Sequence, residues 1–228
     1  MYYYSTSLSR LLYTGYGTHF SYVFVGTPPQ RQTVIVDTGS HYTGFPCTGT
    51  HIHLDTIYLI PHIPYLYIRA GCSQCGNHVN PYWDIKNSTT ATIPKCGGTN
   101  QCSISQSYSE GSSWKGYLVQ DKFYVGASNT IINTNTHSVT PSNTPATANT
   151  LLSVDFQFAC QTYETGLFRT QLADGIMGMS ISEDTLPAQL MKQKVTNTRI
   201  FALCYRVGGG IMTLGGVRIR YPYISTRI

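Results

Sequence analysis

The turn at residues 37–40 places one carboxylate where it can do acid–base chemistry. Asp37 directly follows the apolar run 34–36, whose β-branched side chains predict a buried strand. Gly39 lets the backbone turn sharply, and the hydroxyls of Thr38 and Ser40 can hydrogen-bond the turn and the carboxylate. An acid held at the end of a strand suits proton transfer. Asp-Thr-Gly alone also occurs in ordinary β-turns, so the flanking residues must decide.

The residues before Asp37 predict the element that positions it. Residues 18–25 alternate as a half-buried strand does, the GTPPQ stretch at 26–30 breaks the alternation, and 31–36 begins a second run. This pattern predicts a hairpin whose return strand ends at Asp37.

Three ordered stretches together resemble the N-terminal lobe of pepsin-like aspartic proteases. GTPPQ at 26–30 with VIVDTGS at 34–40 resembles the catalytic hairpin, and 105–112 followed by Gly116 resembles the flap hairpin. Residues 173–179 resemble the hydrophobic-hydrophobic-glycine segment that lies beside the catalytic turn. The resemblance covers about residues 16–217, and the cysteine-rich insert with the Tyr-Ser-Glu-Gly-Ser flap resembles the nepenthesin and plasmepsin V-like branches.

The resemblance implies an all-β fold. We expect a single pepsin-type lobe, half of the bilobal acid protease fold, with mostly antiparallel sheets and one or two short helices. The composition agrees, because charged residues are only 11% of the chain while 18 Tyr, 21 Gly and 11 Pro favour strands joined by many turns.

The resemblance implies a division of roles within the catalytic turn. Asp37 would be one of two paired catalytic acids, and Thr38 would brace the turn against its counterpart in the other lobe. Gly39 would contact the substrate backbone, and Ser40 would orient the outer oxygen of Asp37.

The resemblance also implies a flap and a pocket. Tyr108, at the flap tip, would close over the substrate and help to exclude water. Ile35 and Ile176 would line the pocket beside the scissile bond. The alternative interpretations are an exposed hairpin tyrosine and two ordinary core isoleucines.

The sequence supplies only one of the two acids that the family requires. Aspartic protease dyads are the standard example of two carboxylates that share one proton. No second Asp-Thr-Gly or Asp-Ser-Gly follows Asp37, and Asp174-Gly175 belongs to the segment beside the turn. In the family the second acid comes from a C-terminal lobe, so the resemblance implies that this chain carries half an active site.

The implied function is aspartic endopeptidase activity on peptide or protein substrates, with no cofactor. The partner that completes the dyad would be the missing C-terminal lobe or a second chain. Two alternatives stay open: a non-catalytic, peptide-binding or inhibitor-like single lobe, and a homodimer in which each chain contributes Asp37.

Two positions differ from the usual family pattern or add to it. The tryptophan that normally stands seven residues after the catalytic aspartate, and binds the flap tyrosine, is replaced by Gly44. We therefore expect a different anchor for the flap, with Trp114 as the candidate. Glu110 in the flap is an acid that would favour basic substrate side chains if it faces the cleft, and is otherwise a solvated charge.

Other classes of function are weaker interpretations. The net charge of +5 is spread along the chain, whereas nucleic-acid binding requires a dense basic patch. His51, His53, Cys72 and Cys75 have side chains suitable for a zinc site, but the cysteines also match a disulfide-bonded loop of the family.

The cysteine content predicts an oxidising compartment. The chain has seven cysteines, five of them at Cys47, Cys72, Cys75, Cys96 and Cys102, and the odd number leaves one unpaired within the chain. Residues 87–89 form the only N-glycosylation sequon in the sequence. We expect the secretory pathway, with an extracellular or vacuolar destination. Because residues 1–7 do not resemble a signal peptide, we expect the start to be incomplete, and any membrane anchor would lie in the missing C-terminal region.

The chain divides into a lobe with flanking segments and two unusual stretches. Residues 1–15 are a lead-in, 16–217 form the lobe, and 218–228 are a tail after which a second lobe is missing. Residues 50–71 are a suspected insertion, either a translated intron or a genuine surface loop, and 126–150 are a low-complexity loop.

Overall fold

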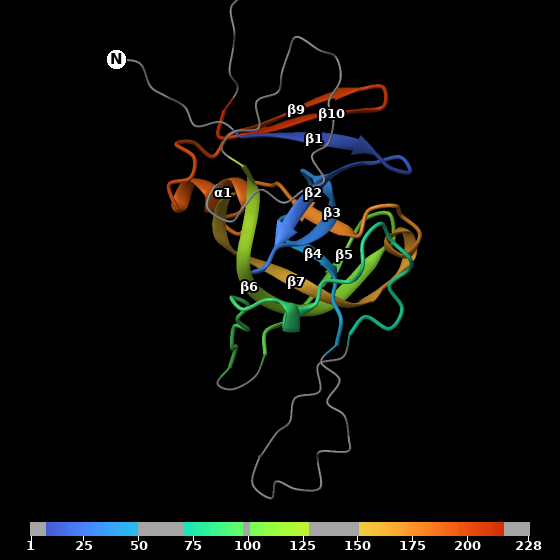
Figure 1. The fold of residues 1–228 in the computed structure, drawn as a ribbon. Coiled ribbons are helices and arrows are strands. Elements are labelled where there is room, and N and C mark those ends of the chain that lie inside the picture. The colour runs from blue at the N-terminus through green and yellow to red at the C-terminus, as the bar shows by residue number, and fades with distance from the viewer. Residues whose placement is uncertain (1–7, 50–70, 98–100, 128–150, 217–228) are drawn as a thin grey trace, which may run out of the picture.

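The computed structural model describes residues 8–49, 71–97, 101–127 and 151–216 (Figure 1). The suspected insertion at 50–71, the low-complexity loop at 126–150 and the tail at 218–228 therefore lie almost wholly outside the described residues.

Strands dominate the described chain, which confirms the all-β expectation. The strands are β1 (Leu8–Thr14), β2 (His19–Val25), β3 (Gln30–Asp37), β4 (Thr43–Pro46), β5 (Ser103–Ser107), β6 (Ser113–Ala127), β7 (Leu151–Glu164), β8 (Gly175–Gly178), β9 (Phe201–Arg206) and β10 (Gly209–Leu214). The helical elements are α1 (Leu186–Lys192) and the single 3₁₀ turns η2 (Ile85–Asn87) and η4 (Gly166–Arg169). None of the described helices is long and apolar enough to cross a membrane.

The strands form one sheet that closes on itself over most of its width. Their order is β5-β6-β7-β4-β8-β3-β2-β1-β10-β9, and β2 also pairs with β6, so that β2, β3, β8, β4, β7 and β6 make a ring. All pairings are antiparallel except β3 with β8 and β4 with β7. Strand β10 pairs with β1 on one side and with the edge strand β9 on the other, and the three strands lie in a layer of their own (Figure 1).

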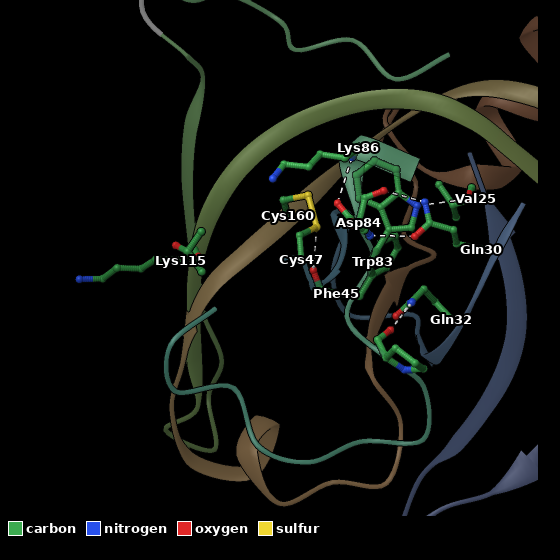
Figure 2. The surroundings of a disulfide bond; sticks show 12 residues. Val25, Gln30, Gln32, Phe45, Cys47, Trp83, Asp84, Lys86, Lys115 and Cys160 are labelled. Carbon is green, nitrogen blue, oxygen red and sulfur yellow. Dashed lines mark hydrogen bonds between the residues drawn. A yellow bond between two sulfur atoms is a disulfide. The ribbon is translucent and has the colours of Figure 1, made fainter. Parts of the chain in front are cut away.

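The ring encloses the main hydrophobic core. Along β7, Val154, Phe156 and Phe158 are buried while Asp155 and Gln157 between them are exposed, as the two-residue period of a strand requires. Trp83 is fully buried against Phe158, and its indole nitrogen donates to the Val25 carbonyl oxygen at 3.1 Å (Figure 2).

Strand β1 differs from the expected lead-in at 1–15. Leu8–Thr14 pairs with β10 along five residues and with the start of β2 at its other end. The partner in β10 is about 200 residues away in sequence, so no local pattern marks this pairing.

The described cysteines form three disulfides: Cys47–Cys160, Cys72–Cys75 and Cys96–Cys102. Cys204 is free and exposed, as the odd number predicted. The first bond joins the parallel neighbours β4 and β7 across 113 residues of sequence (Figure 2). Three disulfides are typical of a protein that folds in an oxidising compartment.

Candidate active site

The turn at residues 37–40 follows β3 and lies beside β8 and the residues that come after it. Strand β3 runs parallel to β8, with Ile35 opposite Ile176 and Asp37 opposite Gly178. Beyond the ladder, Met179 N donates to the Asp37 carbonyl oxygen at 2.7 Å and Ser180 N donates to the Ser40 carbonyl oxygen at 3.0 Å. The segment at 173–179 thus lies beside the turn, as expected.

Gly178 permits this close approach. Its backbone passes close to the backbone of His41, which follows the turn. A Cβ atom added at Gly178 would lie 2.4 Å from the His41 carbonyl carbon. Real Cβ atoms do not approach backbone atoms so closely, so any other residue here would push the threaded segment away from the turn.

The Asp37 carboxylate is only lightly held. Its Oδ1 accepts one hydrogen bond, from Gly39 N at 2.9 Å, and the residue is half-buried. Thr38 and Gly39 are exposed, where a second lobe or a substrate has access to them. Within the described chain no hydrogen bond joins the Ser40 hydroxyl to Asp37, because this hydroxyl lies near the flap tyrosine instead.

The flap is the hairpin of β5 and β6. Its tip is a tight turn in which Tyr108 N donates to the Ser112 carbonyl oxygen at 2.9 Å and Gly111 N donates to the Tyr108 carbonyl oxygen at 3.0 Å. The Tyr108 ring packs on Phe168 of η4 with 5.1 Å between ring centroids.

Trp114 anchors the flap tyrosine, as the sequence predicted. Its indole Nε1 donates to the Tyr108 hydroxyl at 3.1 Å, and the whole side chain is buried. At Gly44 a Cβ atom would lie 3.1 Å from the Ala159 Cβ and 3.2 Å from the Gln161 Nε2, so this position is tightly packed even for a single added carbon. The indole donor therefore comes from β6 instead of from β4.

The three residues predicted to contact substrate gather in one apolar cluster. Ile176 belongs to a small buried group with Trp114, Ala159 and Phe168, and the half-buried Ile35 and Tyr108 pack against it. The structure brings these side chains together beside the turn, and this placement is compatible with both a pocket wall and a core.

The electrostatics of Tyr108 link the flap to the turn. Burial raises the pKa of the Tyr108 phenol, and the negative charges of Asp37 and Glu110 raise it further, against the opposing hydrogen bond of Trp114 and the nearby Ser40 hydroxyl. The phenol therefore stays protonated and can donate a hydrogen bond at acid and neutral pH.

A buried ion-pairing couple lies behind the flap, and sequence reasoning missed it. Glu164 stands opposite Trp114 in the β6–β7 ladder, and its Oε2 lies 3.5 Å from His78 Nε2, with both side chains fully buried. Burial raises the pKa of Glu164. Burial alone would lower the pKa of His78, but the adjacent Glu164 carboxylate outweighs it and raises that pKa. The partners are far apart in sequence, so no motif marks the couple.

Asp174 is a second carboxylate on the same strand pair, but it is saturated with donors. It accepts from Thr33 N at 2.5 Å, Thr33 Oγ1 at 2.7 Å, Asn80 N at 2.8 Å and Asn80 Nδ2 at 2.7 Å, and it is 1% exposed. It joins the start of the β3–β8 ladder to Asn80, in the loop that follows the Cys72–Cys75 disulfide, which makes it a structural anchor.

The structure argues against the alternative interpretation of a zinc site, because both candidate sulfur ligands are oxidised. Cys72 and Cys75 are joined to each other in a disulfide, so neither is available as a thiolate. His51 and His53 lie outside the described residues.

Known proteins match this chain along most of its length. The profile of the family described as xylanase inhibitor N-terminal matches residues 19–216. Aspartic protease 5 of Toxoplasma gondii is 31% identical over 236 aligned residues, which cover 88% of this chain and 20% of that protein. Plasmepsin V of Plasmodium falciparum (isolate 3D7) is 26% identical over 220 residues, covering 90% and 30% respectively. Aspartic proteinase 36 of Arabidopsis thaliana is 29% identical over 217 residues, covering 92% and 40%.

The chain thus spans less than half the length of these relatives. Nearly all of its own length lies within the matches, and the matched proteins are aspartic proteases. The chain therefore belongs to the pepsin-like aspartic protease family.

Proposed function

We propose that this chain is the N-terminal, flap-bearing half of an aspartic endopeptidase, with Asp37 as one of its two catalytic acids. The observation that carries the proposal is the placement of Asp37. It ends β3 with a single hydrogen bond to its carboxylate, next to a flap tyrosine that is anchored by Trp114. The names of the relatives support the same function.

In the proposed reaction the two acids of the pair share one proton and bind a water molecule. The ionised acid takes a proton from the water while the water oxygen attacks the peptide carbonyl carbon, and the protonated acid gives its proton to the carbonyl oxygen. The acid that took the proton from the water then gives it to the amide nitrogen while the other acid takes a proton back from a hydroxyl of the tetrahedral intermediate, so that the C–N bond breaks, the amine leaves and the dyad again holds one proton. Asp37 supplies one acid, so the second must come from a C-terminal lobe or from another chain.

The flap would contribute by ordering substrate and excluding water. Tyr108 keeps its proton and points into the cluster that contains Ile35 and Ile176, where the side chain of a bound peptide would pack. Thr38 and Gly39 are exposed at the turn, as contacts to a second lobe and to a substrate backbone require. The proposed substrates are peptides or proteins, and the proposed setting is the secretory pathway.

The experiment is a comparison of the 228-residue chain with the same chain joined to whatever follows it in the complete transcript. Hydrolysis of an unfolded protein in acid, blocked by a pepstatin-type inhibitor, is expected only for the longer protein. Hydrolysis by the short chain whose rate rises with the square of its concentration would instead indicate the homodimer.

A second candidate is an inhibitor-like lobe without catalysis. It is favoured by the description of the matching family profile, which names xylanase inhibitors. Saturable binding of a peptide or of a target enzyme by the short chain, with no turnover by the longer protein, would support this candidate over the endopeptidase.

A further inference from the structure

We propose that Asn87 is the attachment site of an N-linked glycan, on a loop at the end of β3 opposite to Asp37. The inference rests on the secretory setting of the proposed function and is independent of its catalysis. Residues 87–89 form the sequon, and six of the seven cysteines are disulfide-bonded, as expected for a chain that passes through an oxidising compartment.

The Asn87 side chain is free to carry a substituent. Asn87 is exposed at the end of η2, and its backbone N donates to the Asp84 carbonyl oxygen at 3.1 Å. Within the described chain its side-chain amide takes part in no hydrogen bond, and the neighbouring Lys86, Thr89 and Thr90 are exposed as well. A sugar on this amide would enter solvent and displace no packed group.

The other two sequon residues hold the loop in place. Ser88 Oγ donates to the buried Asp121 carboxylate at 2.6 Å and accepts from Thr27 N at 3.0 Å. Thr89 Oγ1 donates to the Thr27 carbonyl oxygen at 3.1 Å. Because the fold occupies the Thr89 hydroxyl, we expect transfer to occur on the nascent chain before this contact forms.

The loop lies far from the catalytic turn. Gln30, the first residue of β3, holds the start of η2 through two hydrogen bonds to Asp84. Its Oε1 accepts from Asp84 N at 2.8 Å, and its Nε2 donates to the Asp84 carbonyl oxygen at 2.7 Å (Figure 2). Asp37 is the last residue of the same strand, about 20 Å away at the usual rise per residue. A glycan at Asn87 would therefore leave the flap and the turn open.

The transfer uses a lipid-linked pyrophosphate oligosaccharide as donor. The Asn87 Nδ2 forms a bond to the anomeric carbon of the sugar and loses a proton, while the bond between that carbon and the pyrophosphate oxygen breaks. The lipid pyrophosphate leaves, and no oxidant or reductant is required.

The direct test is peptide mass spectrometry of the protein purified from its own cells, before and after treatment with peptide-N-glycosidase. Enzymatic release converts the glycosylated asparagine to aspartate, so residue 87 is expected to be read as aspartate after treatment. Residue 87 read as unmodified asparagine in the untreated protein would overturn the proposal.

Variants expressed behind a secretion leader in eukaryotic cells separate the sequon from the fold. N87Q and T89A are expected to lose the enzyme-sensitive gel shift, while T89S and N77Q, the latter a change at an exposed asparagine outside the sequon, keep it. S88A keeps the sequon but loses the hydrogen bonds of the Ser88 hydroxyl to Asp121 and Thr27, so it should be glycosylated yet less stable to urea. Because transfer precedes folding, material retained in the cell reports the shift equally well. A shift that persists in N87Q or T89A would contradict the assignment and leave the proposed peptidase function untouched.

Discussion

The two ends of the β3–β8 ladder carry two carboxylates in opposite states. At one end, Asp174 is buried and accepts four hydrogen bonds from Thr33 and Asn80. At the other end, Asp37 is half-buried and accepts one, from Gly39. Three residue pairs of parallel strand, from Val34–Gly175 to Val36–Met177, separate them. Both aspartates stand close to a glycine in sequence, so that feature does not distinguish them. What distinguishes an acid available for chemistry from a structural anchor is the number of hydrogen-bond donors around it and its access to solvent.

The largest expected effect comes from removing the saturated carboxylate. In D174A the amide donors of Thr33 and Asn80 lose their acceptor inside the protein. We expect a loss of about 3–5 kcal/mol in the free energy of unfolding, which is enough to unfold a marginal lobe. Urea denaturation followed by circular dichroism measures it.

D174N is the matched control for that change. It keeps the shape of the side chain but turns an amide NH₂ toward donors, so we expect an intermediate loss. An unchanged urea midpoint in both variants would show that Asp174 is not an anchor.

The second effect concerns the flap, which lies next to the Asp37 end of the ladder. W114F removes the indole donor to Tyr108 while keeping an aromatic ring in the buried cluster. In the proposed two-lobed protein we expect kcat/KM for a peptide to fall by roughly tenfold, because one hydrogen bond of about 1.4 kcal/mol orders the flap.

Turnover has to be compared with stability in the same variant. F168L, which changes the ring packed on Tyr108 but not its hydrogen bond, is the control for loss of packing. Equal rates for W114F and the unmodified protein would show that the hydrogen bond from Trp114 to Tyr108 does not contribute to turnover.

The third effect is a pH dependence that arises behind the flap, at Glu164 and His78. Both groups have raised pKa values in the folded lobe, Glu164 above 4.5 and His78 above 6.5, so the folded state binds more protons than the unfolded state. Stability is therefore expected to fall as pH rises above about 4.5 through the folded pKa of Glu164, and again above about 6.5 through that of His78. Asp174, Arg169 and Tyr82 are the charged or titratable groups that act on this couple.

The check is a series of urea midpoints between acid and neutral pH. E164Q is expected to flatten the first part of the fall, whereas E110Q, which removes an exposed flap carboxylate, should leave it unchanged. A midpoint that rises with pH in the unmodified lobe would have the wrong sign.

The sequence predicted the Asp37 end of the β3–β8 ladder far better than the Asp174 end. The hairpin of β2 and β3, the turn at Asp37, the flap and the role of Trp114 all depend on residues close together in sequence, where turn and strand patterns are strong. The four contacts of Asp174 reach Thr33 and Asn80, which lie 141 and 94 residues away. Likewise, β1 pairs with β10, and His78 meets Glu164, although the partners are far apart in sequence. Such contacts leave no local pattern, so only the folded chain reveals them.

The measurement that tests the central claim most directly is the turnover of D37N in the complete protein, with its unfolding measured alongside. We expect peptide hydrolysis to fall by roughly 100- to 10,000-fold, because the dyad loses one acid. The free energy of unfolding should change by no more than about 0.5 kcal/mol, because Asp37 accepts a single hydrogen bond at an accessible turn. Undiminished hydrolysis in D37N, or a loss of activity explained entirely by unfolding, would contradict the assignment of Asp37 as a catalytic acid.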